Sequence, residues 1–95
     1  MRFWHSKEDE ILSRMHEVLI GHEYEQRTDE DNSEEWVHPT LGVRVVLGRT
    51  SSTHDPIYAS VSHLPDDNNR AWNSKGLLIH IGQAERNAEL TRRKP

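Results

Sequence analysis

The chain has 95 residues, of which 33% are hydrophobic, and a length this small excludes two independent domains. Its formal charge of −4 at neutral pH argues against general attraction to the nucleic-acid backbone. The absence of cysteine excludes disulfides, thiolate metal sites and cysteine nucleophiles, and no apolar run approaches the ~20 residues of a membrane span. We therefore expect one polar, cytoplasmic domain over residues 1–95, with no cofactor.

The first predicted element is a helix that begins after Ser6 and ends at Gly21. Ser6–Asp9 resembles a capping box with aspartate in the place of the usual glutamate, and the acidic residues 8–10 complement the dipole of the first turn. Four apolar residues recur at helical spacing, which predicts packing against one face of a sheet. They are Ile11, Met15, Val18 and Leu19.

The segment 23–35 holds seven acids and one base, a density that predicts a solvated acidic loop. Because Tyr24 and Trp36 flank this segment, the alternative is a short strand at 23–27 paired with 35–38 across a long turn. A loop of this charge would suit a basic protein partner or partly imitate a phosphate backbone.

A β-hairpin is predicted for residues 42–64, which hold two runs of strand-like residues around a polar loop at 49–56. Alternation with a period of two residues places one apolar side of each run on a common wall. The residues of this predicted wall are Val43, Val45 and Leu47 in the first run and Ile57, Ala59, Val61 and His63 in the second.

The C-terminal third is ambiguous. A turn-rich loop is expected at 65–70, and the apolar run between two glycines favours a strand at 77–81. A helix capped by Ser74 is the alternative, since Leu77, Ile81, Ala84 and Ala88 share a helical face. We expect a helix over 83–93 and a basic, disordered tail at 91–95. The predicted fold is α+β, with the N-terminal helix on an antiparallel sheet of two to four strands and a short C-terminal helix.

Seven histidines are scattered through the chain, so a metal site would require the fold to bring several of them together. His38–Thr40 formally matches the His-x-Thr element of two-histidine phosphoesterases, but no second such element follows. A histidine- or metal-dependent phosphoesterase or nuclease using His38, His54, His63 or His80 therefore remains an alternative function. Binding of nucleic acid through the basic C-terminus is a second alternative. Its residues would be Arg86, Arg92, Arg93 and Lys94.

The three tryptophans are the most informative residues in such a polar chain. One left exposed would be a natural anchor for a partner, because tryptophan, tyrosine and arginine dominate binding hot spots. Trp72 is the candidate, since the sequence places it in a loop beside Arg70; the alternative is a lid over an open end of the sheet. The predicted partner-binding residues are Tyr24, Asp29, Glu30, Asp31, Trp36, Arg70 and Trp72. We predict no catalytic and no metal-binding residue.

The middle third of the chain resembles an uncharacterised group of small proteins from phage and bacterial genomes. The resemblance lies in Trp36-x-His38-Pro39 and in the strands Gly42–Val45 and Ala59–Ser62, although Ala59 stands where that group has histidine. It implies no activity, but it favours a phage-encoded accessory protein. We therefore predict a non-catalytic accessory or inhibitory protein that binds a protein of the host cytoplasm, with self-association as a further possibility.

Overall fold

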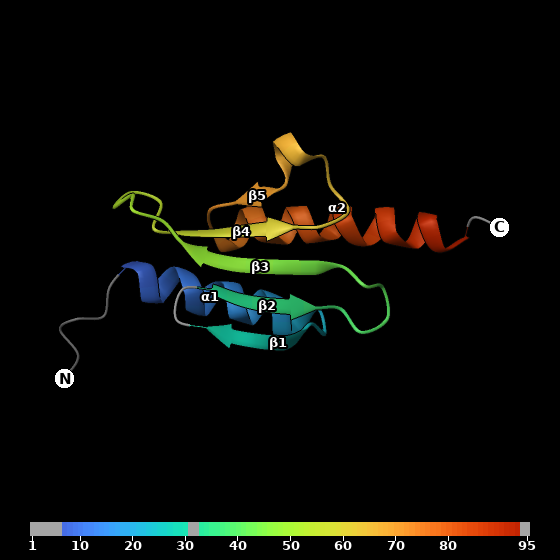
Figure 1. Cartoon of the computed structure of the whole chain (residues 1–95), viewed down its shortest axis with the longest axis horizontal. Coiled ribbons are helices and arrows are strands. Elements are labelled where there is room, and N and C mark those ends of the chain that lie inside the picture. The colour runs from blue at the N-terminus through green and yellow to red at the C-terminus, as the bar shows by residue number, and fades with distance from the viewer. Residues whose placement is uncertain (1–6, 31–32, 94–95) are drawn as a thin grey trace.

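The computed structural model describes residues 7–30 and 33–93 and shows an α+β fold of two layers (Figure 1). A five-stranded antiparallel sheet has the strand order β1-β2-β3-β4-β5, so each strand pairs with its neighbours in the sequence. The elements in chain order are α1 (Lys7–Gly21), β1 (Glu25–Glu30), β2 (Ser33–Val37), β3 (Arg44–Arg49), β4 (Ile57–Val61), the 3₁₀ helix η1 (Asp66–Asn68), β5 (Arg70–Ala71) and α2 (Ser74–Arg93).

The predicted central hairpin is confirmed as β3 and β4. Val45 pairs with Val61 and Leu47 with Ala59, so the apolar side chains alternate onto one face, where all four are buried. His63, expected on the same face, is instead exposed. β4 ends at Val61, and His63 takes a left-handed backbone conformation (φ 68°) that turns the chain out of the strand.

Both helices pack on this face of the sheet and against each other (Figure 1). The apolar stripe of α1 is the predicted one, with Met15 and Leu19 fully buried at its centre. The core that results joins both helices to β2, β3, β4 and β5. Its buried members are Met15, Leu19, Tyr24, Trp36, Val43, Val45, Leu47, Ile57, Ala59, Val61, Ala71, Leu77, Ile81, Ala84 and Ala88.

Most of the segment 23–35 forms the strands β1 and β2, where composition predicted an acidic loop; the alternative of a strand pair is the one realised, with bounds that differ from 23–27 and 35–38. Gln26 pairs with Trp36 and Asp29 with Glu34, which extends the sheet to five strands and past the two to four expected. Composition predicted a loop because only one side chain of β2, that of Trp36, is buried. An edge hairpin can therefore carry acids at its remaining positions without losing its place in the sheet.

The strand expected at 77–81 is wrong, because α2 runs without interruption from Ser74 to Arg93. Asn73, not Ser74, supplies the cap: its Oδ1 accepts the Gly76 backbone N–H at 2.8 Å. The apolar spacing that allowed a helix is the one realised, since all four of its residues are buried against the sheet. Within residues 7–30 and 33–93, no helix combines the length and apolarity that crossing a bilayer demands.

The other side of the sheet faces away from both helices, and we call it the open face. Strand alternation assigns it Val46, Gly48, Tyr58, Ser60 and Arg70, each one position from a buried neighbour. Antiparallel sheets commonly leave one face to solvent in this way. Here that face carries an aromatic ring and arginine next to the β5 edge.

Leu47→Ala should lower the free energy of unfolding by about 2–5 kcal/mol, because Leu47 is 2% exposed and its loss leaves a cavity between the sheet and the helices. The matched control is Ile79→Ala, whose side chain is 63% exposed on α2 and should change stability by no more than ~0.5 kcal/mol. Urea denaturation followed by circular dichroism measures both. Equal losses would contradict the placement of the core.

Candidate binding surface

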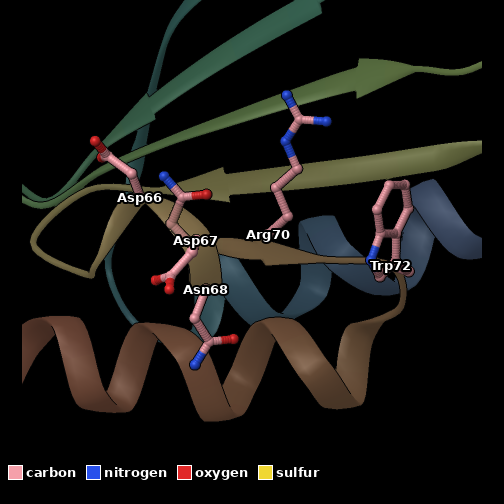
Figure 2. A pocket seen from close by; sticks show the side chains of 6 residues that line it. Asp66, Asp67, Asn68, Arg70 and Trp72 are labelled. Carbon is pink, nitrogen blue, oxygen red and sulfur yellow. The ribbon is translucent and has the colours of Figure 1, made fainter.

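The candidate surface lies where β5 leads into α2. β5 ends at Ala71 because Trp72 and Asn73 turn the chain into the capped start of α2. Alternation about the buried Ala71 sends the side chains of Arg70 and Trp72 to the same side. Figure 2 shows both rising from the β5 segment on the side away from α2. Trp72 is 39% exposed, in contrast to the buried Trp36.

A pocket of about 310 Å³ opens beside these two residues (Figure 2). Its other wall is the loop that carries η1, which Pro65 starts by accepting the Asn68 backbone N–H at 2.9 Å. The volume is at the lower end for ligand pockets, and it suits one or two side chains of a partner. The residues that line it are Asp66, Asp67, Asn68, Asn69, Arg70 and Trp72.

Arg70 is held by an aromatic ring. Its guanidinium carbon lies 4.9 Å from the centroid of the Tyr58 ring, a cation–π contact on the open face. Tyr58 was not among the predicted site residues, although the signal was present. It alternates with Ile57 and Ala59, and the predicted hairpin turns those residues inward, so Tyr58 had to face outward.

Trp36 was predicted as a partner contact, but the structure places it in the core, 5% exposed. Its indole Nε1–H donates to Glu34 Oε1 at 3.0 Å, and His16 Nε2 lies 2.6 Å from the same oxygen. The His16 and Trp36 rings are 5.2 Å apart. Trp36 therefore joins α1 to β2 and offers little surface to a partner.

Tyr24, which follows the C-terminal end of α1, is likewise buried and is 4% exposed. Its hydroxyl donates to Glu85 Oε2 at 2.9 Å, and His22 Nδ1 lies 3.4 Å from that oxygen. Burial, together with the hydrogen bond to Glu85 and its negative charge, raises the pKa of Tyr24 far above its ordinary value. The ring also meets His38 edge-on, with centroids 5.3 Å apart.

The predicted acidic contacts are divided. Asp29 and Glu30 belong to β1, the edge strand of the sheet, whereas Asp31 lies outside the described residues. β1 and β5 are opposite edges of the sheet. These acids are therefore at the opposite edge of the sheet from Trp72. The structure does not gather the predicted partner-binding residues into one patch.

Two of the described histidines, His38 and His80, contact the backbone of their own segments. His38 Nδ1 accepts the backbone N–H groups of Thr40 and Leu41, at 3.2 and 3.0 Å, and so shapes the turn between β2 and β3. His80 Nδ1 lies 2.9 Å from the Gly76 carbonyl oxygen within α2. Among residues 7–30 and 33–93, no three His, Cys, Asp or Glu side chains are grouped so that they could hold a metal ion.

Ser62 and His63 resemble a nucleophile and its base, with Oγ and Nδ1 2.8 Å apart. The same Oγ accepts the Arg44 backbone N–H at 2.8 Å, a bond that closes the end of the β3–β4 pair. Asn87 Nδ2 in turn donates to the His63 carbonyl oxygen at 2.8 Å. Through these hydrogen bonds, Ser62 and His63 attach the turn after β4 to β3 and to α2, which explains why the two side chains lie together.

Comparison with protein-family models, with curated proteins and with solved structures finds no match to this chain. The resemblance to small phage and bacterial proteins stays a prediction from the sequence.

Tyr24 should make stability fall at alkaline pH. Above the ordinary tyrosine pKa of about 10, the unfolded chain loses the Tyr24 proton while the folded protein keeps it. The stabilisation is thus complete below that pH and declines as pH rises toward the folded-state pKa, by at most ~1.4 kcal/mol per pH unit. Urea unfolding at pH 9 to 11 should show a steeper decline for the wild type than for Tyr24→Phe. Parallel curves would contradict the burial of this hydroxyl.

Proposed function

We propose that this protein is a non-catalytic binding protein, of the accessory or inhibitory kind, which docks on a protein partner through the surface around Trp72. The observation that supports this most is the 39% exposure of Trp72 beside a pocket, in a fold that buries Trp36 to 5%. A large indole is costly to leave in water, and tryptophan is enriched at the centre of binding interfaces.

The pocket indicates what the partner supplies. An apolar or aromatic side chain entering it would pack against the Trp72 indole and be screened from water by the polar rim. Asp66 and Asp67 stand exposed on that rim, and the whole chain carries a formal charge of −4. Both features favour a partner whose contact surface is basic, because opposite potentials speed the encounter and disfavour wrong partners.

The competing explanation is that Trp72 is a lid that only covers the end of the sheet. Under that explanation the indole would stabilise the fold and contribute nothing to binding. The two explanations differ in what removal of the indole does: a docking residue affects the partner, and a lid affects the free energy of unfolding. The proposal that the partner is a host protein is supported by the sequence resemblance to small phage and bacterial proteins. It includes no catalytic step.

Trp72→Ala should abolish capture of the partner while the protein stays folded. The tagged full chain is immobilised and incubated with bacterial lysate, and captured proteins are quantified by mass spectrometry for wild type, Trp72→Ala and the control Ile79→Ala, exposed on α2. We expect a protein retained by wild type and by the control but reduced roughly tenfold or more by Trp72→Ala, as for hot-spot residues.

Two results would contradict this proposal. One is capture that differs in no protein between wild type and Trp72→Ala, or no capture at all. The other is a loss of more than ~3 kcal/mol in the free energy of unfolding of Trp72→Ala, which would favour the lid. Once a partner is purified, its association rate should fall as salt is raised, because the attraction between an acidic and a basic surface is screened.

A further inference from the structure

Gly48 and Tyr58 form an arrangement that only glycine permits. They are directly opposite one another in the β3–β4 pair, on the open face. A Cβ atom built on Gly48 would lie 2.5 Å from both Cζ and Oη of Tyr58, closer than side-chain atoms approach one another. The outer end of the Tyr58 ring therefore occupies the space that a side chain at position 48 would take. Any larger residue at position 48 would lift the ring off the sheet.

The guanidinium of Arg70 lies over this Tyr58 ring. Arg70 is opposite Ser60 in the β4–β5 pair and so reaches Tyr58 diagonally, with its guanidinium carbon 4.9 Å from the ring centroid. A cation–π contact of this kind favours positions of the guanidinium over the face of the ring. The chain of dependence thus runs across three strands, from Gly48 in β3 through β4 to Arg70 in β5.

Several arginines of this protein form ion pairs with glutamates, and Arg70 differs from them by its lack of such a pair among the described residues. Arg44 has Glu35 at 2.6 Å, and Arg14 has Glu10 at 3.1 Å. Arg27 and Arg49 are also ion-paired, with Glu25 and Glu8. Among the described residues, no carboxylate lies within ion-pair distance of Arg70, although two aspartates line the same pocket. Its N–H edge is consequently oriented by the ring while its donors remain available.

We propose that Gly48 and Tyr58 are positioning residues that hold Arg70 beside Trp72, so that the guanidinium edge receives an acceptor oxygen of the bound polypeptide partner. The acceptor is a carbonyl oxygen, which a partner with a basic contact surface also offers and to which arginine can present several N–H donors. This recognition role rests on the proposed binding function. The stack itself is a property of the free protein, so the two can be tested separately.

A merely structural reason for the arrangement also exists, since an aromatic ring that covers a glycine on a neighbouring strand stabilises a sheet. Stability measurements alone would not separate the two roles. The readout has to be the position of the Arg70 guanidinium and the strength of partner binding, which a purely structural ring would not influence.

The first experiment follows the Arg70 side-chain Nε–Hε signal by NMR in the free ¹⁵N-labelled full chain, assigned by its loss in Arg70→Lys. In wild type the Tyr58 ring current should displace this signal. Tyr58→Leu should abolish the displacement and Gly48→Ala should reduce it, whereas Tyr58→Phe, which keeps the ring, should preserve it. The control is Gly82→Ala, because a Cβ at position 82 meets no atom within 4 Å. If Gly48→Ala does not fold, the comparison of Tyr58→Leu with Tyr58→Phe decides whether the Tyr58 ring positions Arg70.

The second experiment measures affinity for the protein that wild type captures and Trp72→Ala loses. Tyr58→Leu and Gly48→Ala should bind roughly two- to fivefold more weakly, the worth of an exposed cation–π contact, and Tyr58→Phe should bind as wild type does. An Arg70 signal that is the same in wild type and Tyr58→Leu would overturn the proposed stack. Unchanged affinity in Tyr58→Leu would overturn its role in recognition.

The two failures are distinguishable. If no protein depends on Trp72 for capture, the proposed function fails and the recognition role of Arg70 falls with it, whatever the NMR spectra show. If Trp72 matters for binding and Tyr58 does not, the binding function stands and only the positioning role is refuted.

Discussion

The whole structure depends on one packing contact, the burial of the inner face of β3 and β4 beneath α1 and α2. In a chain with 33% hydrophobic residues, few side chains are available for a core, and nearly all of the buried ones belong to this contact. Residues such as Leu47 and Ala59 pair across the strands and meet Leu77 and Ile81 from α2 in one cluster. Apolar burial of this kind is the main favourable term in folding.

Because the core is built on one face of the sheet, the other face is left to solvent. The alternation that turns Ile57 and Ala59 inward turns Tyr58 and Ser60 outward, so the open face is a direct consequence of how the core is built. The candidate binding surface forms where this face meets the β5 edge. There a strand of two residues ends and the loop with η1 stands beside it, forming the pocket (Figure 2).

The fold uses its described aromatic residues in two ways. Tyr24 and Trp36 are buried, and each directs its polar atom to a glutamate, so that burial of the ring leaves no donor without a partner. Tyr58 and Trp72 lie on the outer side, one stacked under Arg70 and the other exposed. This division supports a surface organised for contact at Trp72, since the same fold is able to bury aromatic rings elsewhere.

The sequence by itself determined the elements whose signal is local. The spacing of Met15 and Leu19 predicted α1, and the alternation from Val43 to Val61 predicted the central hairpin, because one buried face imposes its period on the residues that build it. The structure confirms these two predictions.

Only the tertiary structure decided the rest. The acidic segment could pair as β1 and β2 because a neighbouring strand supplies backbone hydrogen bonds, which composition does not reveal. The run 77–81 fits either period, and the Asn73 cap together with burial against the sheet selects the helix. The stack of Gly48, Tyr58 and Arg70 joins three strands, so it exists only once their register is set. Contacts between residues distant in the chain depend on that register, and no local pattern specifies it.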